Sequence, residues 1–301
     1  MHSPRWCRGE PRRSRLPPLG TTPGKSAPRR WHFAAAWARP VPATADRQLA
    51  LVTGASGGMG LEFAKLLAAD GYDLALVARS EDKLRDVAAS LAQKHGIEAT
   101  PVALDLATPD AASALFLRVP RCDVLINNAG FASNGKFQEI PEARIGEELF
   151  LDVVTLTQLT RKYVPGMLER KNGKILNVAS TAGFLPGPFM AVYYACKAYV
   201  ISFSQAIAEE LRGSGVTVSV FTPGATATGF AERAGTSNSL LFTKTPVANA
   251  SAMARAGYRG MQRGQLVIVP PPLTNLVTEL SARFTPRRVL LWFSRKAVER
   301  T

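Results

Sequence analysis

The stretch L-A-L-V-T-G-A-S-G-G-M-G, Leu49–Gly60, decides the fold. Its first five residues are an apolar run typical of a buried strand, and the helical pattern Leu61–Ala69 follows its glycines. Strand, glycine-rich turn and helix in this order form a unit that holds the pyrophosphate of a dinucleotide at the helix N-terminus. Gly54 permits the tight turn, Gly58 lets the backbone approach the phosphates, and Gly60 lets helix and strand pack closely.

The alternation of strand and helix continues along the chain. Further strands are predicted at Asp73–Ala78, Ala99–Leu104, Val124–Ile126, Lys174–Ala179, Val216–Phe221 and Leu266–Val269. Helices are predicted at Glu81–His95, Leu149–Leu168 and Pro246–Arg263. This rhythm indicates an α/β fold in which helices cover both faces of one doubly wound parallel sheet. Ligands of such sheets bind at the carboxyl ends of the strands.

The loops at these strand ends carry candidate cofactor residues. Arg79 follows the second strand, where NAD sites usually place a carboxylate for the ribose hydroxyls. A guanidinium can pair with a 2′-phosphate, so we expect NADP, with NAD as the less favoured cofactor. The alternative for Arg79 is a solvated surface arginine. Asp105 is expected to meet the adenine, Asn127 and Asn128 to tie neighbouring strands together, and the hydroxyls of Thr222–Thr228 to reach a carboxamide.

The stretch Ser180–Lys197, S-T-A-G-F-L-P-G-P-F-M-A-V-Y-Y-A-C-K, carries the candidate chemistry. Tyr193 and Lys197 are four residues apart and share one face of a helix. Lys197 is expected to lower the pKa of the Tyr193 phenol towards neutrality, and Ser180 to donate to the same substrate oxygen. A Y-x-x-x-K pattern alone is most often a plain helix stripe. The dinucleotide unit in the same chain favours a general acid instead.

Five motifs occur in one order: T-G-x-x-x-G-x-G (Thr53–Gly60), N-N-A-G (Asn127–Gly130), the serine Ser180, Y-x-x-x-K (Tyr193–Lys197) and P-G (Pro223–Gly224). Through them the chain from about Gln48 to Phe230 resembles the short-chain dehydrogenase/reductase family. The resemblance implies a Rossmann-type sheet, an NADP or NAD cofactor and reversible hydride transfer between a carbonyl and an alcohol. It implies that Tyr193 donates the proton, that Ser180 polarises the oxygen, and that Lys197 holds the ribose and lowers the tyrosine pKa. A homodimer or homotetramer is expected on the family analogy alone.

These motifs define the expected site. The catalytic residues are Ser180, Tyr193, Lys197 and Asp152, and no metal is expected. The cofactor-binding residues are Gly54, Ser56, Gly58, Met59, Gly60, Arg79, Asp105, Asn128, Ala129, Gly130, Tyr193, Lys197, Pro223, Gly224, Thr226 and Thr228. Phe131, Phe184, Phe189 and Phe230 lie near the motifs and suggest an apolar pocket for a small carbonyl or alcohol substrate, although aromatic residues near a site are equally often plain core.

One catalytic position departs from the family pattern. Aligning Phe150–Arg161 with the usual helix places Asp152 where such enzymes carry an asparagine that helps to hold a water in a proton relay to the lysine. An ionised aspartate only accepts hydrogen bonds, and it adds negative charge near Lys197. It can stay protonated or form an ion pair with Lys197 that alters the Tyr193 pKa. We expect catalysis with a shifted pH profile; the alternative is a weakened protein that senses NADP(H). Met59, where isoleucine or leucine is usual, should affect packing only.

The charge of the chain is uneven. The net charge of +14 divides into +8 over residues 1–47, −2 over residues 48–230 and +8 over residues 231–301. A near-neutral body argues against specific nucleic-acid binding, because such proteins carry their charge on the folded face. The three cysteines are too few for a disulfide framework or a zinc site, so a reducing, cytoplasmic location is expected. No apolar run approaches the ~18 residues of a membrane span.

The chain is divided into three parts. Residues 1–47, rich in Pro and Arg, are expected to be a disordered extension; a transit peptide or a start codon assigned too far upstream also fits, but a secretion signal does not. Residues 48–270 form the expected catalytic domain, with Ala231–Thr245 as a mobile substrate lid. Residues 271–301 are a basic amphipathic extension. We expect it to pack on the body or on a second subunit rather than to lie on an acidic membrane surface.

Overall fold

A parallel sheet of seven strands forms the centre of the computed structural model, which describes Val41 and residues 47–236, 247–271 and 284–298. The strand order is β3-β2-β1-β4-β5-β6-β9. The strands are β1 (Leu49–Thr53), β2 (Asp73–Ala78), β3 (Ala99–Ala103), β4 (Val124–Asn127), β5 (Gly173–Val178), β6 (Val216–Phe221) and β9 (Val267–Ile268). The order reverses between β1 and β4, which is where doubly wound sheets open a ligand crevice. The predicted Rossmann-type sheet is confirmed.

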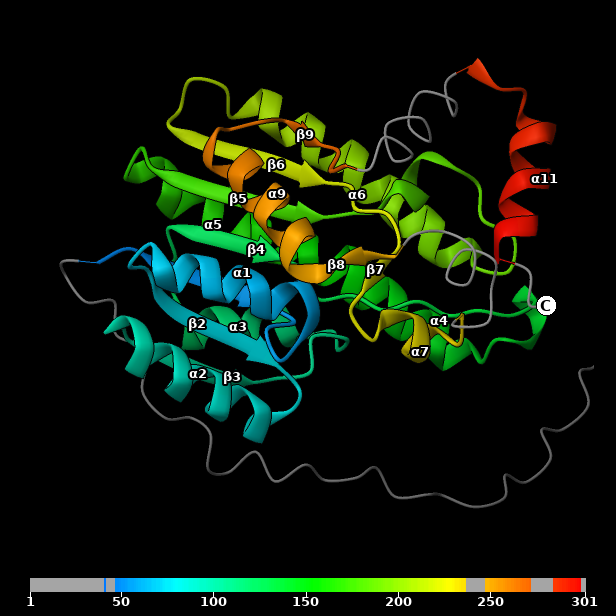
Figure 1. The fold of residues 1–301 in the computed structure, drawn as a ribbon. Helices are drawn as coiled ribbons and strands as arrows, with labels where there is room; N and C mark the ends of the chain where they lie inside the picture. The colour runs from blue at the N-terminus through cyan, green and yellow to red at the C-terminus, as the bar shows by residue number, and fades with distance from the viewer. Residues whose placement is uncertain (1–40, 42–46, 237–246, 272–283, 299–301) are drawn as a thin grey trace, which may run out of the picture. The chain divides into compact units, whose positions relative to one another are not determined.

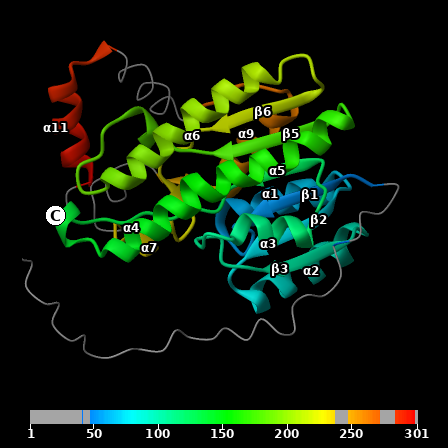
Figure 2. The ribbon, with the colours of Figure 1, turned by 180° about the vertical axis from the view of Figure 1, so that it is seen from behind.

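Helices cover both faces of this sheet (Figures 1 and 2). One face carries α1 (Gly58–Ala69), α2 (Glu81–His95) and α9 (Ala250–Gln262). The other carries α3 (Ala111–Arg118), α5 (Leu156–Glu169) and α6 (Ala191–Glu210). At the carboxyl ends of the strands lie α4 (Glu142–Leu149), α7 (Phe230–Ala234), α11 (Arg287–Val298) and the short parallel pair β7 (Thr226–Ala227) and β8 (Ala248–Asn249). Within the described ranges, no helix has the length and apolar character needed to cross a membrane.

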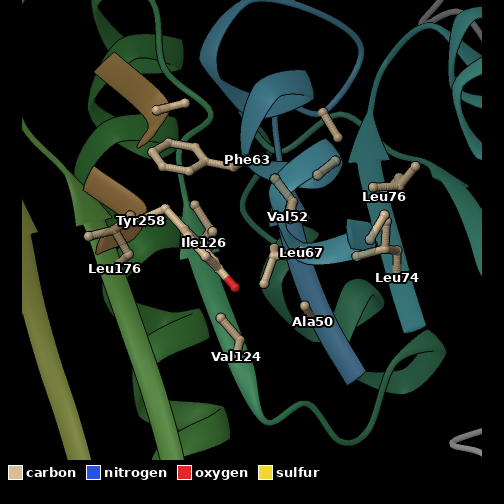
Figure 3. Close-up of a cluster of buried hydrophobic side chains, with 14 of the residues drawn as sticks. Ala50, Val52, Phe63, Leu67, Leu74, Leu76, Val124, Ile126, Leu176 and Tyr258 are labelled. Carbon is tan, nitrogen blue, oxygen red and sulfur yellow. The ribbon is translucent and has the colours of Figure 1, made fainter. Parts of the chain in front are cut away.

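The core follows the two-residue period of the strands. Ala50 and Val52 of β1 pack with Phe63, Leu67 and Tyr258 beneath α1 and α9 (Figure 3). The intervening residues Leu49 and Leu51 pack on the opposite face with Leu115 and Leu159. Because both faces are covered, each central strand reads as a continuous apolar run rather than an alternating one. This is why the strands were predictable from the sequence.

Two predicted helices have different limits in the structure. Helix α1 begins at Gly58 rather than Leu61, so Gly58, Met59 and Gly60 form its first turn. The predicted helix Leu149–Leu168 is interrupted, because a π-helical turn, Phe150–Thr155, joins α4 to α5. A π turn widens the backbone spacing locally and occurs mostly at functional sites. Asp152 lies within it.

The expected extensions are described only in part. The chain divides after Ala38, and every described residue belongs to Arg39–Thr301. The predicted disordered extension, 1–47, therefore lies outside the described residues except for Val41 and Arg47. The same holds for positions 237–245 of the expected lid, whereas its first residues belong to α7.

Buried asparagines tie the sheet to its helices. Asn127 Nδ2 on β4 donates to Asn177 Oδ1 on β5 at 2.9 Å and to Thr160 Oγ1 on α5 at 3.3 Å. Asn177 Nδ2 in turn donates to Ser204 Oγ on α6 at 2.9 Å. An amide carries both donors and an acceptor, so one side chain links two neighbours. The expectation that an asparagine at the end of β4 ties strands together is confirmed.

We expect Asn177→Ala to lower the free energy of unfolding by about 1–3 kcal/mol, because it removes two buried hydrogen bonds, one from Asn127 Nδ2 and one to Ser204 Oγ. Urea denaturation without cofactor measures the loss. Thr217→Val on neighbouring β6 is the control, since Thr217 Oγ1 is buried without a partner among the described residues. An equal loss in both variants would contradict the role given to the amide chain.

Candidate active site

The glycine turn after β1 has the conformation that its sequence requires. Gly54 and Gly58 have φ angles of +69° and +55°, in the left-handed region that favours glycine. A Cβ on Gly60 would lie 2.2 Å from the Gly54 carbonyl oxygen, so the turn closes tightly on the first turn of α1. This arrangement agrees with the roles predicted for Gly54 and Gly60. It presents the N-terminus of α1 to the crevice, as phosphate binding requires.

Thr53, the last residue of β1, fixes the opposite wall. Its Oγ1 accepts hydrogen bonds from the backbone N–H groups of Asn128 and Ala129, both at 2.9 Å, and donates to the Ile126 carbonyl at 3.2 Å. Asn128 Nδ2 returns a hydrogen bond to the Thr53 carbonyl at 2.8 Å. Thr53 was not in the predicted site; its place as the last residue of the strand, directly before Gly54, is the signal that could have identified it.

A cavity of about 500 Å³ opens between these walls. The predicted site residues that line it are Met59, Asn128, Gly130, Ser180, Tyr193, Lys197, Pro223, Gly224, Thr226 and Thr228. Met59 also packs against the core, as expected. Arg79 and Asp105 do not line the cavity; they are exposed at the ends of β2 and β3, and the Asp105 carboxylate accepts a hydrogen bond from the Ala107 N–H at 3.0 Å. Their predicted contacts with a cofactor stay predictions.

The four predicted catalytic residues lie together. Ser180, Tyr193 and Lys197 line this cavity, and Asp152 is buried beside Lys197. Lys197 Nζ donates to Asp152 Oδ1 and to the Val178 carbonyl, each at 3.2 Å. The same nitrogen lies 5.5 Å from the centre of the Tyr193 ring. The Ser180 hydroxyl interacts with the Tyr193 phenol and accepts the Ala182 N–H at 3.1 Å. Three separate elements, the end of β5, α6 and the π-helical turn, therefore converge on one point.

This geometry agrees with comparisons against known proteins. Residues 48–238 match the family model described as short chain dehydrogenase. The chain belongs to the short-chain dehydrogenase family. Over 175 residues it is 38% identical to a very-long-chain 3-oxoacyl-CoA reductase of Laccaria bicolor, which covers 56% of this chain and 52% of that protein. The chain thus spans about half the length of this curated relative.

Two solved structures resemble this dehydrogenase. A short-chain dehydrogenase from Sphingobium yanoikuyae in complex with NADPH is 33% identical, with a TM-score of 0.72 over 78% of this chain and 93% of that chain. L-Sorbose reductase from Gluconobacter frateurii, complexed with NADPH and L-sorbose, is 26% identical, with a TM-score of 0.62 over 74% of this chain and 95% of that chain. The fold and the oxidoreductase class of this chain follow from these likenesses.

The Tyr193 phenol of the dehydrogenase is buried, and burial raises its pKa above the ordinary value of 10.0. The Lys197 ammonium and the Ser180 hydroxyl act in the opposite direction, while the charge of Asp152 adds to the rise. Lys197 therefore acts on this pKa in the predicted direction, but burial outweighs its effect, so the pKa lies above its ordinary value rather than near neutrality. Sequence spacing places the cation correctly but does not report how completely the phenol is removed from water.

Asp152 forms the ion pair with Lys197 that was one of its two expected states. The carboxylate is 1% exposed, and a Cβ on Gly130 would lie 2.4 Å from its Oδ1, so only glycine leaves room for it. Burial raises the pKa of Asp152, and Lys197 opposes that rise. For Lys197 burial acts to lower the pKa, but Asp152 and Tyr193 raise it above the ordinary value. The lysine therefore stays charged.

The rest of the cavity wall of the dehydrogenase is mostly apolar, and most of its residues were not predicted from the sequence. It includes Leu185, Met190, Leu290, Phe293, Ser294 and Ala297, of which the last four belong to α11. The face of α11 that carries Leu290 and Val298 is buried, which supports packing of the C-terminal extension on the body; Leu291 and Trp292 are exposed. Of the four predicted aromatic residues, only Phe230 lines the cavity, 5.3 Å from the Tyr193 ring.

We expect Gly60→Ala to destabilise the dehydrogenase by about 1–3 kcal/mol and to weaken dinucleotide binding, because the new methyl group overlaps the Gly54 carbonyl. Gly57→Ala is the matched control: its φ of 175° suits any residue, and nothing lies within 4 Å of the added Cβ. Denaturant unfolding and cofactor fluorescence titration measure both effects. A Gly60→Ala protein as stable as the control would show that the turn has room for a methyl group at position 60.

Proposed function

We propose that this dehydrogenase is an NADP(H)-dependent reductase that interconverts a carbonyl and an alcohol, and that its substrate is a bulky, apolar ketone. The observation that carries the proposal is the convergence of Ser180, Tyr193 and Lys197 at one end of a cavity whose other wall is apolar. This convergence favours an enzyme over a sensor of NADP(H). Expectations of a homo-oligomer and of a cytoplasmic location remain predictions.

The residues present fit a dinucleotide. The glycine turn has no side chain at Gly54, Gly58 or Gly60. A Cβ on Gly58 would lie 3.0 Å from Thr228, so only glycine fits at that position. Gly54, Gly58 and Gly60 would hold the pyrophosphate, while Asn128, Thr226 and Thr228 line the adjoining cavity. When bound, the nicotinamide cofactor supplies or accepts the hydride.

Proton transfer is assigned to three side chains of the protein. Ser180 orients the substrate oxygen by hydrogen bonding, and Tyr193 donates its phenolic proton to that oxygen as negative charge develops. Lys197, a charged neighbour of the Tyr193 ring, stabilises the phenolate that remains. Because burial raises the pKa of the phenol, Tyr193 is protonated near neutral pH. This state suits reduction, whereas oxidation of an alcohol needs the phenolate and hence a higher pH.

The substrate class is argued from the cavity wall. Leu185, Met190, Leu290 and Phe293 offer no hydrogen bonds, so a substrate gains affinity there by burying apolar surface. Ser294 is 4% exposed in this wall, and its Oγ has no partner among the described residues, so it can accept one polar group of a substrate. The name of the Laccaria bicolor relative makes a 3-oxoacyl thioester one candidate within this class.

We expect the enzyme to oxidise NADPH with 2-decanone or a 3-oxodecanoyl thioester but not with L-sorbose, whose hydroxyl groups would lose their hydration against the apolar wall. Tyr193→Phe should reduce kcat by at least about 100-fold, because it removes the hydroxyl group that donates the proton while keeping the aromatic ring. Absorbance at the nicotinamide band follows turnover. Turnover that survives in Tyr193→Phe would overturn the assignment of the proton donor.

We expect Arg79→Ala to raise the KM for NADPH by about tenfold or more without changing the KM for NADH, because the guanidinium pairs with the 2′-phosphate alone. Arg85→Ala is the control, since Arg85 is equally exposed on α2 and pairs with Glu81. Steady-state kinetics with NADPH and with NADH gives the ratio of the variant KM to the wild-type KM for each cofactor. If the KM values rose together, Arg79 would be a surface arginine without a role in cofactor choice.

A further inference from the structure

A second acid lies beside the catalytic ion pair. Glu148, at the end of α4, is 0% exposed, and its Oε2 accepts the Ser133 N–H at 3.1 Å. Among the described residues Glu148 forms no ion pair. The nearest cation on its own helix, Arg144, is hydrogen-bonded to Glu147 and stacks 3.8 Å from the Phe131 ring centre. Burying an ionised carboxyl group that has no cation beside it costs much free energy. Such a group is therefore favoured in its protonated form.

One loop holds both acids. The chain after β4 places the Phe131 N–H at Asp152 and the Ser133 N–H at Glu148. Alternate residues of an extended loop are about 6.6 Å apart and face the same side. Residues four apart on a helix are about 6 Å apart along its axis and also share a side. One loop thus contacts both acids, and the charge of Asp152 acts on Glu148, so the two carboxyl groups are neighbours.

Each acid carries a buried oxygen without a hydrogen-bond partner among the described residues. These oxygens are Asp152 Oδ2 and Glu148 Oε1. Buried polar atoms are normally satisfied by protein or by ordered water. Two neighbouring carboxyl groups beside a single ammonium cannot both ionise without leaving a net negative charge in a buried site. One proton between the two acids removes that charge and supplies a donor to the unpaired oxygens.

We propose that Glu148 and Asp152 share one proton, and that this proton reprotonates Tyr193 by way of Lys197 after each reduction. The proposal rests on the proposed function. Once the Tyr193 proton has passed to the product oxygen, the phenolate takes a proton from the Lys197 ammonium. The resulting amine takes the proton of the acid pair, and water reprotonates the pair. No electrons move in these steps, and the proton consumed comes from solvent. Glu148 acts through Asp152 and Lys197, so it is a positioning residue of the relay.

The surrounding charges agree with a proton held near neutral pH. Burial raises the pKa of Glu148 from its ordinary 4.5 to about 7; the Ser133 hydrogen bonds and Arg144 lower it, and Asp152 raises it. Tyr193, Cys196 and Lys197 of α6 face the same acids. The pair therefore loses its proton as the pH rises through about 7.

The first test is the pH dependence of kcat for 2-decanone reduction by the full chain with NADPH. The wild-type kcat is expected to fall above about pH 7. Glu148→Gln cannot give up a proton, so it should lower kcat by at least about tenfold, leave KM unchanged and remove the fall above pH 7. Glu147→Gln, one residue away and exposed, is the control and should keep the wild-type profile. Asp152→Asn should move the fall to lower pH, because it removes the charge that raises the Glu148 pKa.

The second test needs no substrate, so it separates failure of this proposal from failure of the proposed function. A carboxyl whose pKa is higher in the folded state stabilises the protein less as the pH rises from about 4.5 to about 7. Glu148→Gln lacks this dependence, so its Tm relative to the wild type should increase between pH 5 and pH 8 in thermal unfolding. A Tm difference that does not change with pH, or a Glu148→Gln enzyme that keeps the wild-type fall in kcat, would overturn the proposal.

Discussion

The burial of one ammonium group constrains the rest of this site. Lys197 is 5% exposed, and a buried charge is stable only when it is paired and hydrogen-bonded. Its partners come from three places in the chain: Asp152 on the π-helical turn, the carbonyl of Val178 at the end of β5, and the ring face of Tyr193 one helical turn earlier. Gly130 has to lack a side chain so that Asp152 can approach. The catalytic geometry is therefore a consequence of neutralising Lys197.

Position 152 carries an aspartate where the family usually has an asparagine. This difference changes the net charge around Lys197. An amide at position 152 would leave the Lys197 ammonium as a net positive charge, whereas Asp152 balances it, and Glu148 behind it adds a second acid. Burial raises the pKa of Tyr193, and the negative charges of Asp152 and Glu148 add to that rise. In the function proposed above, this keeps Tyr193 protonated as the proton donor and favours reduction over oxidation.

The sequence predicted most of the sheet, because buried parallel strands are continuous apolar runs and the limits of β1, β2 and β6 agree with the structure. It also predicted the glycine turn and the meeting of Ser180, Tyr193 and Lys197, since fixed spacings encode both. The π-helical turn was missed because its residues carry the same apolar pattern as an α-helix. The burial of Tyr193, the position of Glu148 and the wall formed by α11 depend on contacts between distant segments, and no local pattern reports those.

Helix α11 separates two properties of the enzyme along the chain. The residues that we propose to transfer the proton lie between positions 148 and 197. The cavity-lining residues Leu290, Phe293, Ser294 and Ala297 belong instead to α11. Substitutions in α11 can therefore reshape the substrate cavity without altering Lys197, Asp152 or the glycine turn. Changes in α11 alone can therefore alter which substrates the protein accepts, while the residues around Lys197 and the glycine turn stay the same.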